Sequence, residues 1–522
     1  MKEASHLQNS LSHTVEARDL IAIPYLPDGV DGKGITPLSK EQLLRIDCSF
    51  DGVTALGLSA PQSVEEEEKL VRSFLDGLRK LFQPDTNWTF LQPLTLTLDN
   101  CARCQTCTNA CPIYIASGGK EIYRPTYRAD LLRRIKQKYL GGSRIWARLA
   151  GNDVQLNWTT IAQLAESAYR CTLCRRCSQA CPMGIDNGLV AREIRKLLSQ
   201  ELGIAPRELH RLGTVKQLTV GSSTGMNPMA FADIKEFMED DLKERTGKQI
   251  EIPVDQQGAD VLLLHNAGEF IAWPENPEAF AVILNAAGIS WTLSSRLSGY
   301  DGVNYGAWYD DIQLARIAAT HARVAIGLDV RRIVVGECGH ATKALVVTAD
   351  SLLTGPLRIN RESCLPLLRD LVVKDALHLD PGRNDFAVAL HDPCNLVRLS
   401  GIVEPQRQIL QKVCPQYREM TPNRTNNYCC GGGSGFAIMS SANFMDWRMK
   451  VAGRLKVSQI LETFRDCLDP GIKKYVCAPC SNCKAQIRDL LSYYQLDKKY
   501  NIVYGGLAEL VANAMTDIPP IL

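Results

Sequence analysis

Two runs of cysteine in the first half of the chain have identical spacing. The first run comprises Cys101, Cys104, Cys107 and Cys111, and the second comprises Cys171, Cys174, Cys177 and Cys181, each followed by a proline. The pattern C-x2-C-x2-C-x3-C-P is typical of [4Fe–4S] ligation. Three thiolates on one tight loop can bind three corners of an iron–sulfur cube. The fourth thiolate, displaced onto a short helix, points away and binds the other cube.

This exchange of the fourth ligand assigns each cysteine to one of two predicted cubane clusters. The first cluster takes Cys101, Cys104, Cys107 and Cys181, and the second takes Cys171, Cys174, Cys177 and Cys111. Zinc is the alternative metal, but zinc usually takes four tetrahedral ligands from separated pairs, which fits two identical proline-closed quartets poorly. Two cubanes alone would indicate an electron relay rather than an enzyme.

A third group of cysteines lies in the last part of the chain. It comprises Cys394, the adjacent pair Cys429 and Cys430, which two glycines follow, and Cys480 and Cys483. Glycines let the backbone approach an inorganic cluster closely, so the pair suits a ligand role. Cys338, Cys394 and Cys480 each follow a short apolar run, and the carboxyl ends of parallel strands gather at one edge of a sheet. We therefore expect these groups to converge on one site.

Residues 259–522 alternate short apolar runs with helical patterns, which predicts parallel strands covered by helices. This region also repeats weakly, with His265 opposite His391 and Cys338 opposite Cys480. The two predicted halves are residues 259–380 and 381–522. The fold class is accordingly α/β, an α-helical ferredoxin-like two-cluster domain followed by two pseudo-repeated parallel α/β halves.

The rest of the chain divides by composition. Residues 1–90 form an expected accessory segment with one amphipathic helix after Ser63, residues 91–215 hold both ferredoxin-type runs, and residues 216–258 are expected to be a linker. A basic helix at 189–198 is expected to present a solvated or partner-facing surface.

Composition excludes several functions for a chain of this kind. Its 522 residues carry 59 basic and 57 acidic side chains, a balance that gives no electrostatic case for nucleic acid. No apolar run is long enough to cross a membrane and no secretory signal opens the chain, so a cytoplasmic location is expected.

The 19 cysteines of the chain cannot all pair internally, and reducing compartments disfavour disulfides. No nucleotide or flavin fingerprint occurs, so electrons are expected from a partner protein.

The cysteine pair with its flanking cysteines resembles the cysteine-rich "CCG" domain of heterodisulfide reductases. The 34 residues between Cys394 and Cys429 match the family's spacing, whereas the 49 between Cys430 and Cys480 exceed it and leave Cys477 as an alternative ligand to Cys480. The resemblance implies a third, noncubane [4Fe–4S] cluster. Its ligands would be Cys394, Cys429, Cys430, Cys480 and Cys483.

Two ferredoxin runs followed by CCG halves, over roughly residues 95–515, resemble the D subunit of heterodisulfide reductase and the K subunit of the complex associated with dissimilatory sulfite reduction. The first half has Gly268 opposite Cys394 and Ala341 opposite Cys483, and of the matching cysteines only Cys338 is left. Such a chain can build one CCG cluster rather than two, which favours the sulfite-associated type.

The resemblance implies a catalytic subunit that reduces a disulfide or trisulfide on a small sulfur-carrier protein with C-terminal cysteines. Electrons would pass through two cubanes to the noncubane cluster. A membrane cytochrome b-type, quinone-linked subunit, with other subunits of the complex, would hold the chain on the cytoplasmic face of the membrane. Cys338 is either an active-site thiol or a remnant of the degenerate half, and His340 and His391 are either proton donors or structural.

Two other functions remain open at this level. One is an electron-transfer subunit for a flavin dehydrogenase acting on glycolate, lactate or glycerol 3-phosphate. The other is a scaffold whose CCG half binds zinc or no metal. The lone CCG cluster favours the reductase over the dehydrogenase subunit, because the dehydrogenase subunits typically carry a fuller pair of CCG halves.

Overall fold

The computed structural model describes residues 15–30, 61–141, 154–297, 306, 308–349, 353–439 and 442–522. Much of the predicted accessory segment 1–90 therefore lies outside the described residues. The chain forms two compact units. The ferredoxin-like unit comprises Met1–Ile23, Asp31–Arg211 and Gly431–Lys456, and the sheet unit comprises Pro24–Val30, Leu212–Cys430 and Val457–Leu522.

The ferredoxin-like unit is helical, as predicted. Its helices are α3 (Val64–Leu81), α4 (Leu91–Asn100), α5 (Pro112–Ala116), α6 (Pro125–Tyr139), α8 (Trp158–Tyr169), α9 (Arg176–Gln179), α10 (Asn187–Leu202) and α23 (Ala442–Trp447). Helix α3 begins where the Ser63 side chain accepts the N–H of Glu66 at 3.2 Å. It buries Phe74, Leu78 and Leu81, which recur at helical spacing.

Helix α10 packs against α3, α4, α6 and α8, and this overturns the expectation for the basic helix at 189–198. Arg192, Arg195 and Lys196 are buried rather than solvated. Burial is tolerated because each charge has partners: Glu193 pairs with Arg192 at 2.6 Å and with Lys196 at 3.0 Å. A buried charge is stable only when it is paired in this way.

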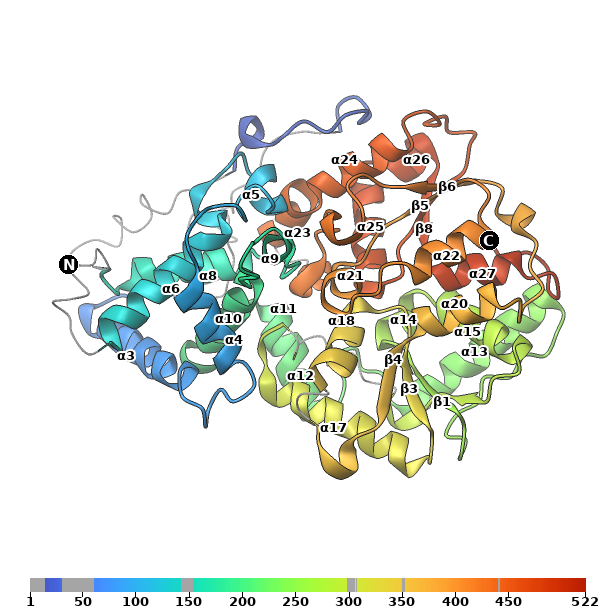
Figure 1. The fold of residues 1–522 in the computed structure, drawn as a ribbon, viewed down its shortest axis with the longest axis horizontal. Helices are drawn as coiled ribbons and strands as arrows, with labels where there is room; N and C mark the ends of the chain where they lie inside the picture. Colours follow the sequence, from blue (N-terminus) through green and yellow to red (C-terminus); the bar gives the residue numbers. More distant parts are fainter. Residues whose placement is uncertain are drawn as a thin grey trace. The chain divides into compact units, whose positions relative to one another are not determined.

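The sheet unit contains two four-stranded sheets in which all neighbouring strands are parallel (Figure 1). The first comprises β1 (Val261–Leu264), β2 (Trp291–Thr292), β3 (Arg332–Val335) and β4 (Asn360–Ser363), and the second comprises β5 (Ala387–Leu390), β6 (Tyr417–Glu419), β7 (Lys474–Cys477) and β8 (Ile502–Gly505). Their orders, β2-β1-β3-β4 and β6-β5-β7-β8, are the same. This confirms the prediction of two pseudo-repeated parallel halves.

The helices of the two halves also correspond. The first half has α14 (Ala267–Ala272), α15 (Glu275–Ala286), α17 (Asp311–Gly327), α18 (Gly339–Thr342) and α20 (Cys364–Val373). The second has α21 (Cys394–Leu399), α22 (Pro405–Val413), α24 (Arg454–Thr463), α25 (Ser481–Tyr493), α26 (Leu496–Tyr500) and α27 (Leu507–Ala514). Helix α15 packs on α27, and α20 packs on α22. In both pairs, the helix after the first strand of one half packs on the helix after the last strand of the other half.

One apolar core runs through both halves of the sheet unit, and it extends beyond them. Helix α13 (Pro228–Thr246) lies in the segment 216–258 expected to be a linker, and it contributes Phe231, Met238 and Leu242 to this core. Part of that segment is therefore packed structure of the sheet unit.

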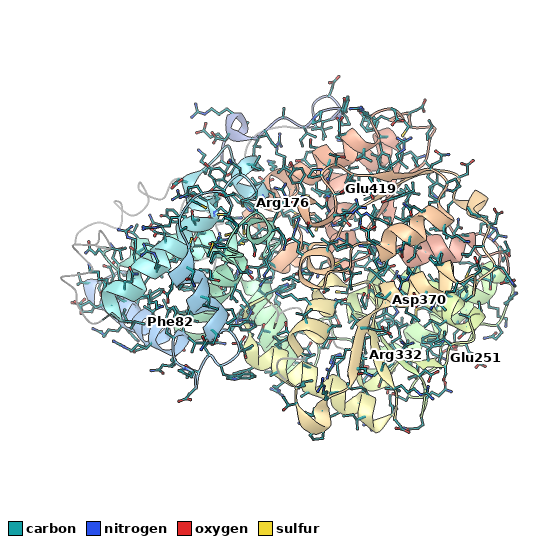
Figure 2. All side chains as sticks on the ribbon, in the orientation of Figure 1. Phe82, Arg176, Glu251, Arg332, Asp370 and Glu419 are labelled. Atoms are coloured by element: carbon teal, nitrogen blue, oxygen red, sulfur yellow. The ribbon has the colours of Figure 1, made fainter. Side chains whose placement is uncertain are left out.

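A buried arginine fixes the end of β5 to the end of β6. The Arg407 guanidinium donates to both carboxylate oxygens of Asp392, at 2.8 and 2.7 Å, and to Glu419, at 2.7 and 3.0 Å (Glu419 is labelled in Figure 2). Asp392 immediately follows His391, so this forked pair positions the segment that carries a predicted site histidine.

We expect the substitution Arg407→Met to lower the free energy of unfolding of the sheet unit by about 3 kcal/mol, because it leaves the Asp392 carboxylate buried without its partner. The loss is measured by guanidinium denaturation of the whole chain, followed by circular dichroism. Arg418→Met is the matched control, because Arg418 lies on β6 next to Glu419 and its own partner Asp466 is exposed, and it should cost less than about 1 kcal/mol. Equal effects of the two substitutions would contradict this role for Arg407.

Candidate iron–sulfur and thiol sites

The two ferredoxin-type loops have the same backbone conformation. Arg103 and Gln105 in the first loop have positive φ angles of 55° and 65°, and Leu173 and Arg175, at equivalent positions in the second, have 51° and 57°. Side chains other than glycine rarely adopt this left-handed conformation. Backbone that alternates between right- and left-handed regions turns its N–H groups inward and makes a concave site for an anion. Both loops are therefore shaped to surround a negatively charged group.

The structure brings the fourth cysteine of each run to the other run. Burial, together with repulsion from the neighbouring thiols of Cys101, Cys181 and Cys104, raises the pKa of Cys107 to about 11. Burial, together with repulsion from Cys174 and Cys171, raises the pKa of Cys111 to about 12. The thiols thus form two groups, with Cys181 in the first and Cys111 in the second.

A cavity lies at the second group. It is lined by Cys111, Cys171, Cys174 and Cys177, together with Arg128, Arg170 and Arg175. Arg128 donates to the Cys171 thiol at 3.4 Å, and the Leu173 N–H donates to the same sulfur at 3.4 Å. Hydrogen bonds to sulfur and nearby cationic charge suit a bound anionic iron–sulfur cluster.

The two groups differ in exposure. Cys104 of the first group is exposed, whereas Cys174 and Cys177 of the second are buried. The first group therefore includes a cysteine that is open to solvent.

A row of buried thiols lies at the carboxyl ends of the strands of the sheet unit. The sulfur atoms of Cys430 and Cys483 are 3.4 Å apart. Contact with Cys429, Cys483 and His391 holds the pKa of Cys430 well below its usual range, and contact with Cys338, Cys483 and His340 does the same for Cys480. The row runs from Cys429 through Cys430, Cys483 and Cys480 to Cys338.

The direction of the pKa shift alternates along this row from Cys430 to Cys338. Hydrogen bonding to Cys430 and Cys480 raises the pKa of Cys483 well above its usual value, and hydrogen bonding to Cys480 does the same for Cys338. The Gly339 N–H also donates to the Cys480 sulfur at 3.3 Å. Cys430 and Cys480 thus have thiolate character, which is the form that binds metals.

Two histidines flank the row. Donor atoms of His391, Cys430 and Cys483 lie within 4.8 Å of one another. The Asn482 side-chain amide lies 2.8 Å from His340 Nδ1, so Nδ1 accepts from that amide and the proton of a neutral imidazole is on Nε2. Asn427 lies 3.4 Å from His391 Nδ1 in the same way. Both imidazoles are therefore oriented by an asparagine.

Cys394 and Cys477 are placed differently from the thiols of the row. Cys394 is buried as the first residue of α21, a helix that packs against α18 beside Cys480. Burial raises the pKa of Cys477, and the charged neighbours that add to this rise are Glu337 and Cys414. Of the two alternatives from the sequence, Cys480 is the one that lies beside Cys483.

The equivalent place in the first half is formed by aromatic rings and a buried carboxylate. His265, opposite His391, lies edge-on to Phe270 and Phe280 with ring centroids 5.7 and 5.3 Å away. Its Nδ1 is 3.4 Å from Glu269. This environment differs from the sulfur-rich one around His391.

Sequence reasoning missed Glu337, which precedes Cys338. Its buried carboxylate accepts the N–H groups of Leu507 and Ala508, at 2.9 and 2.8 Å, at the start of α27. Burial, with repulsion from Glu509, raises its pKa to about 8. A β-carbon on Gly506 would collide with this carboxylate, so glycine is required there. Glu337 thereby ties the strand-end loop of Cys338 to the other half of the unit.

Two known families match the chain. The "4Fe-4S dicluster domain" matches residues 97–185, and the "Cysteine-rich domain" matches residues 388–488. These matches cover both ferredoxin-type runs and the row of thiols except Cys338. Within the described residues, no helix is long and apolar enough to span a bilayer.

Several curated proteins are similar over most of the chain. The Hdr-like menaquinol oxidoreductase iron-sulfur subunit 2 of Archaeoglobus fulgidus is 26% identical over 462 residues, which cover 80% of each protein. The D subunit of the dihydromethanophenazine:CoB–CoM heterodisulfide reductase of Methanosarcina acetivorans is 26% identical over 402 residues, 76% of this chain and 89% of that protein. A probable membrane-anchored ferredoxin of Chromohalobacter salexigens is 22% identical over 465 residues, 84% of this chain and 62% of its own length.

The placement of Cys480 and Cys477 generates a direct test of metal ligation. We expect Cys480→Ser to lower the iron content of anaerobically purified protein by about four atoms per chain, the content of one cluster. Cys477→Ser, a control with an equally buried thiol three residues away, should leave the iron content unchanged. The reverse result would make Cys477 the ligand.

Proposed function

Since the chain belongs to the heterodisulfide reductase-like iron–sulfur subunits, we propose that it carries electrons from a quinol-linked membrane complex to a sulfur substrate and cleaves an S–S bond there. The substrate class is a protein disulfide or trisulfide of dissimilatory sulfur metabolism. The observation that carries the proposal is the row of buried thiols from Cys429 to Cys338, flanked by His391 and His340.

The donor sets fit three iron–sulfur clusters. Two sets are the thiol groups on the ferredoxin-type loops. The third set lies in the sheet unit and comprises Cys394, Cys429, Cys430, Cys480 and Cys483. Clusters of this kind supply and store electrons one at a time. Zinc usually takes four separated ligands, and it gives no reason for five cysteines of which two are adjacent in sequence.

Cleavage of a disulfide consumes two electrons and two protons and yields two thiols. Cys338 lies beside Cys480 at the end of the row and is the thiol that this proposal leaves outside the ligand set. It can therefore meet the sulfur substrate, with its own proton as one of the two. His340, held by Asn482 with its proton on Nε2, is placed to deliver the other.

The chain's place in a complex follows from the same proposal. A cytochrome b-type membrane subunit supplies the electrons, and it holds this chain on the cytoplasmic face of the membrane. Cys104 is the exposed cysteine of the two ferredoxin-type runs, so the electrons enter beside it. A small sulfur-carrier protein with C-terminal cysteines presents the substrate to the sheet unit.

The proposal is tested by thiol release from a disulfide-bearing protein substrate, driven by a chemically reduced viologen dye. We expect Cys338→Ala to lose at least about 100-fold in rate, the scale of a missing proton donor, while its iron content stays at the wild-type level. Cys364→Ala removes an equally buried thiol from the core of the same half and should keep the wild-type rate. Unchanged turnover in Cys338→Ala would remove this thiol from the mechanism.

A further inference from the structure

Arg195 on helix α10 is buried among backbone carbonyl groups of the ferredoxin-like unit. Its guanidinium donates to Ala168 O at 2.8 and 3.0 Å and to Cys171 O at 2.6 Å. Cys171 is the first cysteine of the second ferredoxin-type run. Arg195 thus holds the start of that loop through hydrogen bonds to the main-chain carbonyl groups of Ala168 and Cys171.

The same guanidinium holds a second segment from far along the sequence. Its Nη1 donates to Ser434 O at 3.3 Å and to the Ser434 hydroxyl. Ser434 belongs to the segment Gly431–Lys456, which is part of the ferredoxin-like unit. One side chain therefore bridges the loop after Cys171 and the segment after the cysteine pair.

The backbone of that segment lies directly against the second loop. A β-carbon at Gly433 would come within 2.5 Å of Thr172 O, so only glycine allows this approach. Ser434 is held at φ 64°, a left-handed conformation that costs a non-glycine residue free energy of about 1 kcal/mol or more. The bonds from Arg195 to both acceptors of Ser434 offset that cost. Helix α10 therefore maintains a contact that the segment alone would not favour.

Chain connectivity gives this contact a functional meaning. Thr172 lies between Cys171 and Cys174, two predicted ligands of the second cubane. Gly433 follows Cys430 by three residues. A route of covalent and hydrogen bonds therefore runs from Cys430 along the glycines to Ser434, and through Arg195 to Cys171. Electron transfer slows steeply as such routes lengthen or loosen.

We propose that Arg195 is a positioning residue that holds the segment after Cys430 against the second ferredoxin-type loop and thereby sets the rate of electron transfer between that loop and the cysteine pair. This inference rests on the proposed relay of three clusters. In this proposal, the basic helix at 189–198 positions the segment that connects the two redox sites.

Two variants and one control test the inference in the full chain with its clusters in place. Arg195→Lys keeps the charge but loses the planar fork that reaches four acceptor atoms. Ser434→Ala removes only the hydroxyl and is the milder change. Arg192→Gln removes a guanidinium that is equally buried on the same helix and that pairs with Glu193 and stacks on Phe90.

Two measurements are made on each variant. Hydrogen–deuterium exchange of the peptide covering residues 428–438 reports whether the segment is held. Freeze-quench EPR after rapid reduction reports when the electron leaves the cubanes for the cysteine-pair site. We expect faster exchange and electron transfer slowed by about tenfold or more in Arg195→Lys, with a smaller effect of the same sign in Ser434→Ala. Arg192→Gln should match the wild type in both measurements.

The failure of this inference is distinct from the failure of the proposed function. Unchanged electron transfer in both variants overturns it, whether or not the segment is released, and so does a slower transfer without release. If Arg195→Lys does not fold, Ser434→Ala alone decides by the same criteria. A wild-type chain without a cluster at the cysteine pair would instead refute the proposed function.

Discussion

The close packing of thiols in buried sites is the constraint on which the rest of this structure depends. Burial and mutual repulsion raise the pKa values of Cys107 and Cys111 to about 11 and about 12, which opposes the thiolate form that binds metal. The surroundings counteract this. Left-handed loops turn N–H groups inward, and Arg128 donates to the Cys171 sulfur. The buried guanidinium of Arg128 thus lies among the thiols of the second group.

In the sheet unit, the fold topology brings the buried thiols together. The two halves have one strand order, so equivalent strand ends meet and bring Cys338 beside Cys480. The interface between the halves is kept by paired helices and by the Glu337 carboxylate at the start of α27. The second half has the full set of ligand-type cysteines, whereas Cys338 is the one matching cysteine of the first half. A pseudo-symmetric fold therefore provides one asymmetric site. The second half supplies most of its thiols, and the first half supplies Cys338.

Much of this arrangement was predictable from the sequence, because cysteine spacing is a strong and local signal. Spacing grouped Cys181 with the first run and Cys111 with the second, and the structure brings the same thiols together; their ligation remains a prediction. The pseudo-repeat favoured Cys480 over Cys477, and the structure places Cys480 beside Cys483. Strand β4, with the sequence Asn-Arg-Glu-Ser, was missed because its polar residues do not show the apolar pattern of a buried strand.

Other features could not be predicted because they depend on distant partners. The basic helix at 189–198 has the composition of a surface helix, and only Glu193, Asn87 and the carbonyls around Arg195 explain its burial. Glu337 gave no signal, since its partners Leu507 and Ala508 lie 170 and 171 residues away. The segment Gly431–Lys456 follows the cysteine pair directly yet belongs to the ferredoxin-like unit. Contacts of this length are set by tertiary structure, and local periodicity carries no trace of them.

We propose that the row of thiols in the sheet unit holds a redox cluster in addition to the two cubanes. Metal analysis of anaerobically purified protein, combined with EPR before and after oxidation, tests it most directly. We expect about 12 iron atoms per chain and a paramagnetic signal of the oxidised protein that responds to added thiols. About 8 iron atoms with signals from reduced cubanes alone, or zinc in place of the remaining iron, would contradict it.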